Sequence, residues 1–228
     1  MVIKGVVFDM DDTLYLERDY VRSGFQAVAT HVSDMADEST VFQTLWTLFQ
    51  EGIRGNTFNL LMETMPGLAE RTSIPQLVSI YRNHIPDIAI LPAMRTLLID
   101  LRNQGLPLGL LSDGPLAAQQ AKVDALGLET LVDSIVLTDA LGRDKWKPNP
   151  AGFERLAQTM DVEHKFLVYI GDNPVKDFIA PRTLGWRTIR LRMPGQLRET
   201  DEPTSEAATP DNVVSTMEAL RTVLHSDH

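Results

Sequence analysis

Residues 3–15, IKGVVFDMDDTLY, join a short apolar run to a cluster of acids. The run Val6-Val7-Phe8 is β-branched and aromatic, and it predicts a buried strand over residues 2–8. Three acids follow within four positions, namely Asp9, Asp11 and Asp12. Carboxylates so close together repel one another, and some stay protonated unless a cation lies among them. The stretch therefore predicts a strand whose end carries a metal site, with one acid that can also attack a substrate.

Short apolar runs like the first recur along the chain, at residues 106–111, 133–137, 166–170 and 186–191. Helical patterns of apolar residues lie between these runs, at 97–101, 117–126, 153–160 and 175–184. Parallel strands need a crossover connection, which is usually a helix. The alternation therefore predicts an α/β fold built on a doubly wound parallel sheet.

The stretch from residue 16 to residue 90 breaks this alternation. It has no convincing strand, and helical patterns lie near 20–33, 39–51, 57–64 and 75–84. We expect an all-helical cap domain over 16–90, inserted after the first strand of a core domain formed by 1–15 and 91–228. Near the C-terminus, residues 193–212 have the composition of an exposed connector. A closing amphipathic helix is expected at Val213, Met217, Leu220 and Leu224.

Composition excludes several classes of function. The formal net charge is −10, which argues against a general nucleic-acid binder, because such proteins need basic surface. The chain has no cysteine, so disulfides, thiolate metal sites and cysteine nucleophiles are excluded. No apolar run approaches the length of a membrane span, and no export signal is evident. We therefore expect a cytoplasmic protein with no nucleic-acid or membrane partner, either a monomer or a homodimer.

Polar residues follow each of the expected strands. Ser112-Asp113-Gly114 follows the second, Gly171-Asp172-Asn173-Pro174 follows a later one, and two lysines, Lys145 and Lys147, follow the strand between them. Ligands bind at the carboxyl ends of strands in such sheets, so these groups are expected to meet near Asp9. Mg²⁺ prefers oxygen ligands and often shares them with a substrate phosphate. The residues thus predict a Mg²⁺-assisted phosphate site.

Four motifs carry a resemblance to a known family: DMDDT, LLSDG, KPNPAGF and GDNPVKD. Their order and spacing resemble those of the haloacid dehalogenase (HAD) superfamily, over about residues 2–14 and 92–192. The helical insertion resembles that superfamily's C1 cap. The first motif alone is a weak pattern, whereas all four after their expected strands form a specific one.

The resemblance implies roles for individual residues. Asp9 is expected to be the nucleophile that forms an aspartyl-phosphate, and Asp11 the general acid and base. The implied Mg²⁺ ligands are the carboxylates of Asp9 and Asp172 and the backbone carbonyl of Asp11. The implied phosphate-binding groups are Ser112, Lys147 and the backbone N–H groups of Asp113 and Met10.

Some implied roles leave alternatives open. Lys147 opens the Lys-Pro-x-Pro motif, whereas Lys145 competes with it but lacks that context. Asp177 and Asn173 are expected to support the site, with Asp177 orienting Lys147 or a metal-bound water. Asp113 stands where similar proteins often carry Asn. A carboxylate beside a phosphate is unfavourable unless it points away or meets a cation, so we expect its backbone N–H to bind.

The pattern favours a Mg²⁺-dependent phosphatase that acts on a small phosphorylated metabolite. A phosphorylated sugar is the first expectation and a nucleoside monophosphate the second. A phosphomutase on the same scaffold stays open, and so does a non-enzymatic signalling module that accepts a phosphoryl group on Asp9. A dehalogenase is disfavoured, because carbon–halogen displacement needs neither a metal cluster nor an acid at Asp11.

Substrate choice is expected to come from the cap, which would act as a mobile lid. Its polar loop EGIRGNTFN, residues 51–59, offers Arg54, Asn56 and Asn59 to polar substrate groups. The alternative interpretation of this loop is a plain surface turn. Arg22 and Tyr15, close to the first motif, are further candidates.

Overall fold

The computed structural model describes residues 2–225 of the protein. The chain divides into two compact units, one formed by Met1–Arg18 with Ala89–His228 and the other by Asp19–Ile88. They are called here the core unit and the cap unit. The sequence placed the borders after residue 15 and before residue 91, and these positions stay a prediction.

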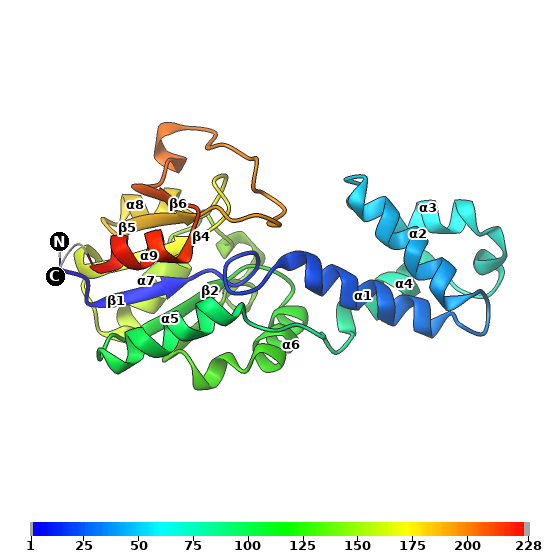
Figure 1. Ribbon diagram of the computed structural model, residues 1–228, viewed down its shortest axis with the longest axis horizontal. Coiled ribbons are helices and arrows are strands. Elements are labelled where there is room, and N and C mark those ends of the chain that lie inside the picture. The colour runs from blue at the N-terminus through cyan, green and yellow to red at the C-terminus, as the bar shows by residue number, and fades with distance from the viewer. Residues whose placement is uncertain (1, 226–228) are drawn as a thin grey trace. The chain divides into compact units, whose positions relative to one another are not determined.

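The core unit is built on a six-stranded sheet (Figure 1). Its order is β3-β2-β1-β4-β5-β6, and all its neighbouring strands run parallel. The bounds are Gly5–Phe8 for β1, Leu108–Ser112 for β2, Ser134–Leu137 for β3, Leu167–Gly171 for β4, Arg187–Leu191 for β5 and Asn212–Val214 for β6. The predicted α/β class with a parallel sheet is confirmed. The strand that precedes the acids, β1, lies centrally between β2 and β4.

Helices cover the sheet of the core unit. They are α5 (Pro92–Asn103), α6 (Leu116–Leu126), α7 (Ala151–Met160), α8 (Ile179–Thr183) and α9 (Met217–His225). Short 3₁₀ turns lie at Leu128–Thr130, Thr138–Leu141, Arg143–Lys145, His164–Phe166 and Glu206–Ala208. One apolar cluster joins α7 and α8 to the sheet through Phe153, Leu156, Ala180, Leu111 and Tyr169. Gly109 lets α7 approach closely, because a Cβ there would lie 2.9 Å from the sulfur of Met160.

Two predicted helices are shorter in the structure. The pattern at 175–184 becomes helical only as α8, because residues 172–178 form the loop after β4. The pattern that begins at Val213 is helical only from Met217. Val213 itself lies in β6, paired with Arg190, and its side chain is 55% exposed. The sequence missed this strand because it is only three residues long and continues into a helix whose apolar spacing includes it by coincidence.

The insertion is all-helical, as predicted. Its helices are α1 (Glu17–His31), α2 (Glu38–Gln50), α3 (Thr57–Thr64) and α4 (Ile74–Asn83), with a 3₁₀ turn at Pro66–Glu70. The cap unit has its own apolar interior, formed by Phe25, Leu45, Phe49, Leu61 and Leu77. Within residues 2–225, no helix combines the length and the apolarity that crossing a membrane demands.

Candidate active site

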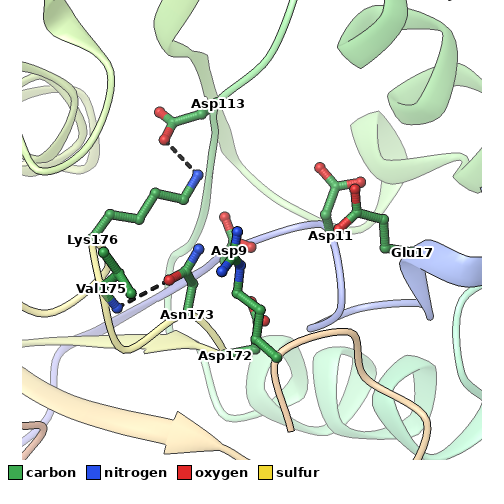
Figure 2. A pocket seen from close by; sticks show the side chains of 9 residues that line it. Asp9, Asp11, Glu17, Asp113, Asp172, Asn173, Val175 and Lys176 are labelled. Atoms are coloured by element: carbon green, nitrogen blue, oxygen red, sulfur yellow. Dashed lines mark hydrogen bonds and ion pairs between the residues drawn. The ribbon is translucent and has the colours of Figure 1, made fainter. Parts of the chain in front are cut away.

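Acidic and basic side chains meet at the carboxyl ends of the central strands, where they line a pocket of about 330 Å³ (Figure 2). Asp9 follows β1, Asp113 follows β2 and Asp172 follows β4. The complete lining is Asp9, Asp11, Glu17, Asp113, Asp172, Asn173, Val175, Lys176 and Arg198. The pocket has the size of a site for a small metabolite.

Three buried carboxylates form a cluster at this edge of the sheet. One oxygen from each of Asp9, Asp172 and Asp177 lies within 4.8 Å of the others. The ammonium of Lys147 lies among them, 2.5 Å from Asp9 Oδ1 and 2.8 Å from Asp177 Oδ1. It also donates to the hydroxyl of Tyr169 at 2.8 Å. The cluster therefore holds three carboxyl groups and one ammonium that are nearly buried, and Asp9 and Asp172 also line the pocket.

Electrostatics within this cluster favour a bound divalent cation. Burial raises the pKa of Asp9 to about 7, although the Lys147 ammonium opposes the rise. Burial, and then the nearby charges of Asp177 and Asp9, raise the pKa of Asp172 well above its usual value. When ionised, three carboxylates and one ammonium leave two negative charges. A hard divalent cation with oxygen ligands neutralises these charges, so the donor set fits Mg²⁺.

Asp11 has a different environment from the cluster. Its Oδ1 accepts hydrogen bonds from Lys122 Nζ at 2.6 Å and from the hydroxyl of Tyr15, and its Oδ2 accepts one from Gln119 Nε2 at 2.8 Å. Burial opposes ionisation of this carboxyl, but Lys122 and these hydrogen bonds outweigh it and lower the pKa. The side chain of Asp11 is therefore held by bonds from α6 while it also lines the pocket, and metal binding by its backbone carbonyl stays a prediction.

The third acid of the opening stretch, Asp12, binds backbone groups of two separate segments. Its carboxylate accepts the backbone N–H of Glu17 at 2.7 Å and that of Leu197 at 2.6 Å. Its carbonyl accepts from Gln196 Nε2 at 2.6 Å. Its φ of 53° lies in the left-handed region, which Asp tolerates better than most residues. Asp12 thereby ties the first turn of α1 to the loop that carries Arg198.

The carboxylate of Asp113 pairs with a cation, which is one of the two arrangements that make a carboxylate beside a phosphate acceptable. Lys176 Nζ lies 2.8 Å from Asp113 Oδ2 (Figure 2). Asp113 Oδ1 accepts hydrogen bonds from Thr138 Oγ1 at 2.7 Å and from the backbone N–H of Lys147 at 3.1 Å. Although burial opposes ionisation, Lys147 and Lys176 lower the pKa of this carboxyl. Asp113 therefore also holds the loop that places Lys147.

The remaining predicted residues lie around the same edge. Ser112 is buried, and its hydroxyl oxygen accepts from Gln119 Nε2 at 2.6 Å. Met10 is also buried, and its carbonyl accepts the backbone N–H of Leu14 at 2.9 Å. Asn173 donates its backbone N–H to Asp177 Oδ2 at 2.9 Å. Asp177 lies so close to Gly171 that a Cβ there would be 2.5 Å from Oδ2, so this position requires glycine.

The sequence offered two lysines, Lys145 and Lys147, for the phosphate site, and the structure buries them to very different extents. The side chain of Lys147 is fully buried in the cluster. The side chain of Lys145 is 41% exposed and pairs with Asp144 at 3.0 Å. Of these two lysines, only Lys147 therefore contacts Asp9.

Sequence reasoning missed five residues of this site: Gln119, Lys122, Lys176, Glu17 and Arg198. Gln119 and Lys122 left a signal, because they are polar residues at helical spacing on the buried face of α6.

Glu17 faces Asp11 (Figure 2). Burial, and then the charge of Asp11, raise its pKa to about 7.

The cap loop residues are exposed. Arg54 donates to the carbonyls of Phe49 and Ile53 at 2.7 and 2.9 Å, and its guanidinium lies over the Phe49 ring. Asn56 precedes α3 without a side-chain capping bond, and Asn59 lies on the helix. The guanidinium of Arg54 is thus bonded within its loop and to the end of α2, as in a surface turn. Substrate contact by these residues, and the lid, stay predictions.

Substitution of Asn59 by Ala is expected to raise KM for the native substrate several-fold and to change turnover of p-nitrophenyl phosphate little. The physical reason is that p-nitrophenyl phosphate offers few polar groups for a side-chain amide to bind. Steady-state kinetics with both compounds measure the effect, and Glu63→Ala on the same helix is the control. Equal losses with both compounds would show that the loop does not select the substrate.

Comparison with known proteins agrees with this geometry. A family model described as haloacid dehalogenase-like hydrolase matches residues 3–185. A glyceraldehyde 3-phosphate phosphatase of Methanopyrus kandleri is 28% identical over 92% of each chain. A pyrimidine 5'-nucleotidase of Escherichia coli is 24% identical over 96% of each chain. The magnesium-bound structure of a putative HAD-hydrolase of Bacillus subtilis, YfnB, matches with a TM-score of 0.68 at 17% identity, covering 99% of this chain and 100% of that one.

Proposed function

Because the chain belongs to the family of haloacid dehalogenase-like hydrolases, we propose that it is a Mg²⁺-dependent phosphatase of a small phosphorylated metabolite. One observation carries the proposal. The buried carboxylate of Asp9 lies 2.5 Å from the ammonium of Lys147 and within 4.8 Å of two further acids, and it lines a pocket that Asp11 also lines. A nucleophile, a cation site and a candidate proton carrier thus share one small space.

In the first half of the reaction, a carboxylate oxygen of Asp9 attacks the substrate phosphorus. A bond forms between this oxygen and phosphorus, and the bond from phosphorus to the ester oxygen breaks. The leaving oxygen takes a proton from Asp11 and departs as an alcohol. Lys147 and the Ser112 hydroxyl bind phosphoryl oxygens, and bound Mg²⁺ supplies further positive charge against them.

In the second half, Asp11 takes a proton from a water molecule, whose oxygen attacks the phosphorus of the aspartyl-phosphate. The bond from phosphorus to the Asp9 oxygen breaks, and inorganic phosphate leaves. Both Asp9 and Asp11 return to their starting states. One ester and one water are consumed, and one alcohol and one phosphate are released.

To act as an acid, Asp11 must carry a proton. In the protein without substrate, burial favours the protonated form, but Lys122 and the hydrogen bonds outweigh it and lower the pKa of Asp11. A bound phosphate adds negative charge beside this carboxyl and displaces water from the pocket. Both effects raise a carboxyl pKa. Substrate binding is therefore the event that we expect to load Asp11 with the proton that it donates.

A phosphorylated sugar or triose is the favoured substrate class. The support is the naming of several relatives at 22–28% identity as glyceraldehyde 3-phosphate phosphatases. A nucleoside monophosphate is the second candidate, supported by the relative named as a pyrimidine 5'-nucleotidase. The pocket's polar lining suits either class, since both present hydroxyls beside the phosphate.

Phosphate release from p-nitrophenyl phosphate and from a panel of phosphorylated metabolites tests the proposed activity. We expect many turnovers per protein molecule with Mg²⁺ present, and the highest kcat/KM for a sugar or triose phosphate. A single equivalent of phosphate bound to Asp9 without turnover would favour the signalling module instead. Conversion to an isomeric phosphate without phosphate release would favour the mutase.

Substitution of Asp11 by Asn is expected to lower kcat by ~10²–10⁴, the range of a general acid–base group. The loss should be smaller for p-nitrophenyl phosphate than for an alkyl phosphate, because p-nitrophenolate leaves without a proton. Steady-state kinetics with the two esters measure the difference. Equal losses would contradict the acid role of Asp11.

A further inference from the structure

Two polar side chains lie on the buried face of α6 and point to the first motif. Gln119 is 2% exposed and Lys122 is 5% exposed. Burying an amide and an ammonium costs stability unless each is paired, so their partners show what they do there. Both side chains have the Asp11 carboxylate as a partner.

The amide of Gln119 joins the acid/base residue to the phosphate site. Its Nε2 lies 2.8 Å from Asp11 Oδ2, 2.6 Å from Ser112 Oγ and 3.0 Å from the carbonyl of Asp113. A carbonyl accepts hydrogen bonds only, and so does an ionised carboxylate, so the NH₂ end of the amide must face them. When Ser112 Oγ accepts from Gln119, its own hydrogen is free for a phosphoryl oxygen.

Lys122 holds the other oxygen of the carboxylate. Its ammonium lies 2.6 Å from Asp11 Oδ1, the oxygen that the Tyr15 hydroxyl also contacts. Lys122 and Gln119 thus fix both ends of the carboxylate from one rigid helix. Charge-assisted bonds of this kind are about twice as strong as neutral ones, which suits a group that must keep one direction.

The turn before α6 is shaped to admit this arrangement. Gly114 has a φ of 145°, and a Cβ there would lie 2.8 Å from Cδ of Gln119. Any larger residue at position 114 would therefore displace the amide from Asp11 and Ser112. The glycine of the second motif thus serves the placement of Gln119 as well as the turn.

We propose that Gln119 and Lys122 are positioning residues for catalysis, which hold the Asp11 carboxylate and the Ser112 hydroxyl in one hydrogen-bond network. The proposal rests on the phosphatase function proposed above, within which Asp11 transfers protons. Lys122 acts through Asp11 and sets the direction of its proton transfer. Gln119 acts through Asp11 and Ser112, so it also affects phosphate binding.

A purely structural role for the two residues predicts different behaviour. If they only filled and paired the buried face of α6, their loss would lower the melting temperature. Any loss of activity would then be independent of Asp11. A positioning role predicts that the effect on kcat disappears once Asp11 cannot transfer protons, because effects of residues that act as a unit do not add.

The experiment uses Lys122→Met and Gln119→Leu, each alone and together with Asp11→Asn. In the otherwise unchanged protein, we expect Lys122→Met to lower kcat about tenfold or more, within the range available to proton transfer, with little change in KM. Gln119→Leu should lower kcat and also raise KM. Lys122→Arg should keep more activity than Lys122→Met, since it retains the charge and a donor.

In the Asp11→Asn background, Lys122→Met should have no further effect on kcat, and Gln119→Leu should keep only its effect on KM. Equal factors in both backgrounds, or single variants with normal kinetics, would overturn the proposal. Gln120→Met, on the exposed face of α6, is the control and should be neutral. Thermal unfolding of each variant separates misfolding from lost positioning. An unsubstituted protein without phosphatase activity would instead overturn the proposed function.

Discussion

Substitution of Asp9 by Asn is expected to abolish turnover, with a fall in kcat of roughly 10⁴-fold or more, as when a catalytic nucleophile is removed. The carboxylate oxygen is the proposed attacking atom, and an amide is a poor nucleophile. The substitution keeps the shape of the side chain, so substrate binding should persist. Kinetics with p-nitrophenyl phosphate and mass spectrometry for the aspartyl-phosphate measure the outcome.

The same substitution is expected to preserve or raise stability in metal-free buffer. Burial raises the pKa of Asp9 from 3.8 to about 7, so ionised Asp9 opposes folding at neutral and higher pH. The folded state binds the proton more tightly than the unfolded chain between these two values. Stability of the unsubstituted protein should therefore fall as pH rises from about 4 to about 7, and the advantage of the variant should grow over that window.

Melting temperatures across pH 4–8 test the sign of this effect, with Asp161→Asn as a control on an exposed acid that also tolerates Asn. Lys147 keeps Asp177 as a partner in the variant, so its charge stays paired. A variant at position 9 that retains near-normal kcat would exclude Asp9 as the nucleophile. A variant that unfolds would contradict the electrostatic account of the cluster.

Removal of divalent metal is expected to abolish activity, and added Mg²⁺ should restore it. The cluster of Asp9, Asp172 and Asp177 carries two uncompensated negative charges when ionised, and phosphate brings more. Without a cation, the ionised nucleophile and the substrate repel each other. Mn²⁺ and Co²⁺ should replace Mg²⁺, since they accept similar oxygen ligands, whereas Ca²⁺ should inhibit because it takes a larger coordination shell.

Binding of the metal can be measured apart from activity. A ligand that binds only the folded state raises the melting temperature with its concentration. Mg²⁺ should therefore stabilise the protein in the absence of substrate, and Asp172→Asn should weaken this effect. Asp144→Asn, on a side chain that is 75% exposed, is the control and should not. Full activity in buffer with EDTA would contradict the metal requirement.

Much of the fold follows from local features of the sequence. Apolar runs of strand length alternate with helical patterns, and the stretch without strands stands out as an insertion. Such signals are local, because the apolar periodicity that indicates a buried strand or helix is formed by residues close together in the sequence. The sequence alone also predicts a common site for Asp9, Ser112, Lys147 and Asp172, since the carboxyl ends of parallel strands meet at one edge. Motif context was enough to favour Lys147 over Lys145.

The tertiary structure decided where each acid of the opening stretch lies and what it contacts. Periodicity and residue type do not distinguish Asp9, Asp11 and Asp12, but of these three only Asp9 joins the buried cluster, while Asp11 is bonded from α6 and Asp12 binds two backbone N–H groups. The contacts of Lys122 with Asp11 span 111 positions, and those of Leu197 with Asp12 span 185. Local patterns cannot specify such pairs, because the role of a carboxylate depends on which charges and donors the fold brings within a few ångströms of it.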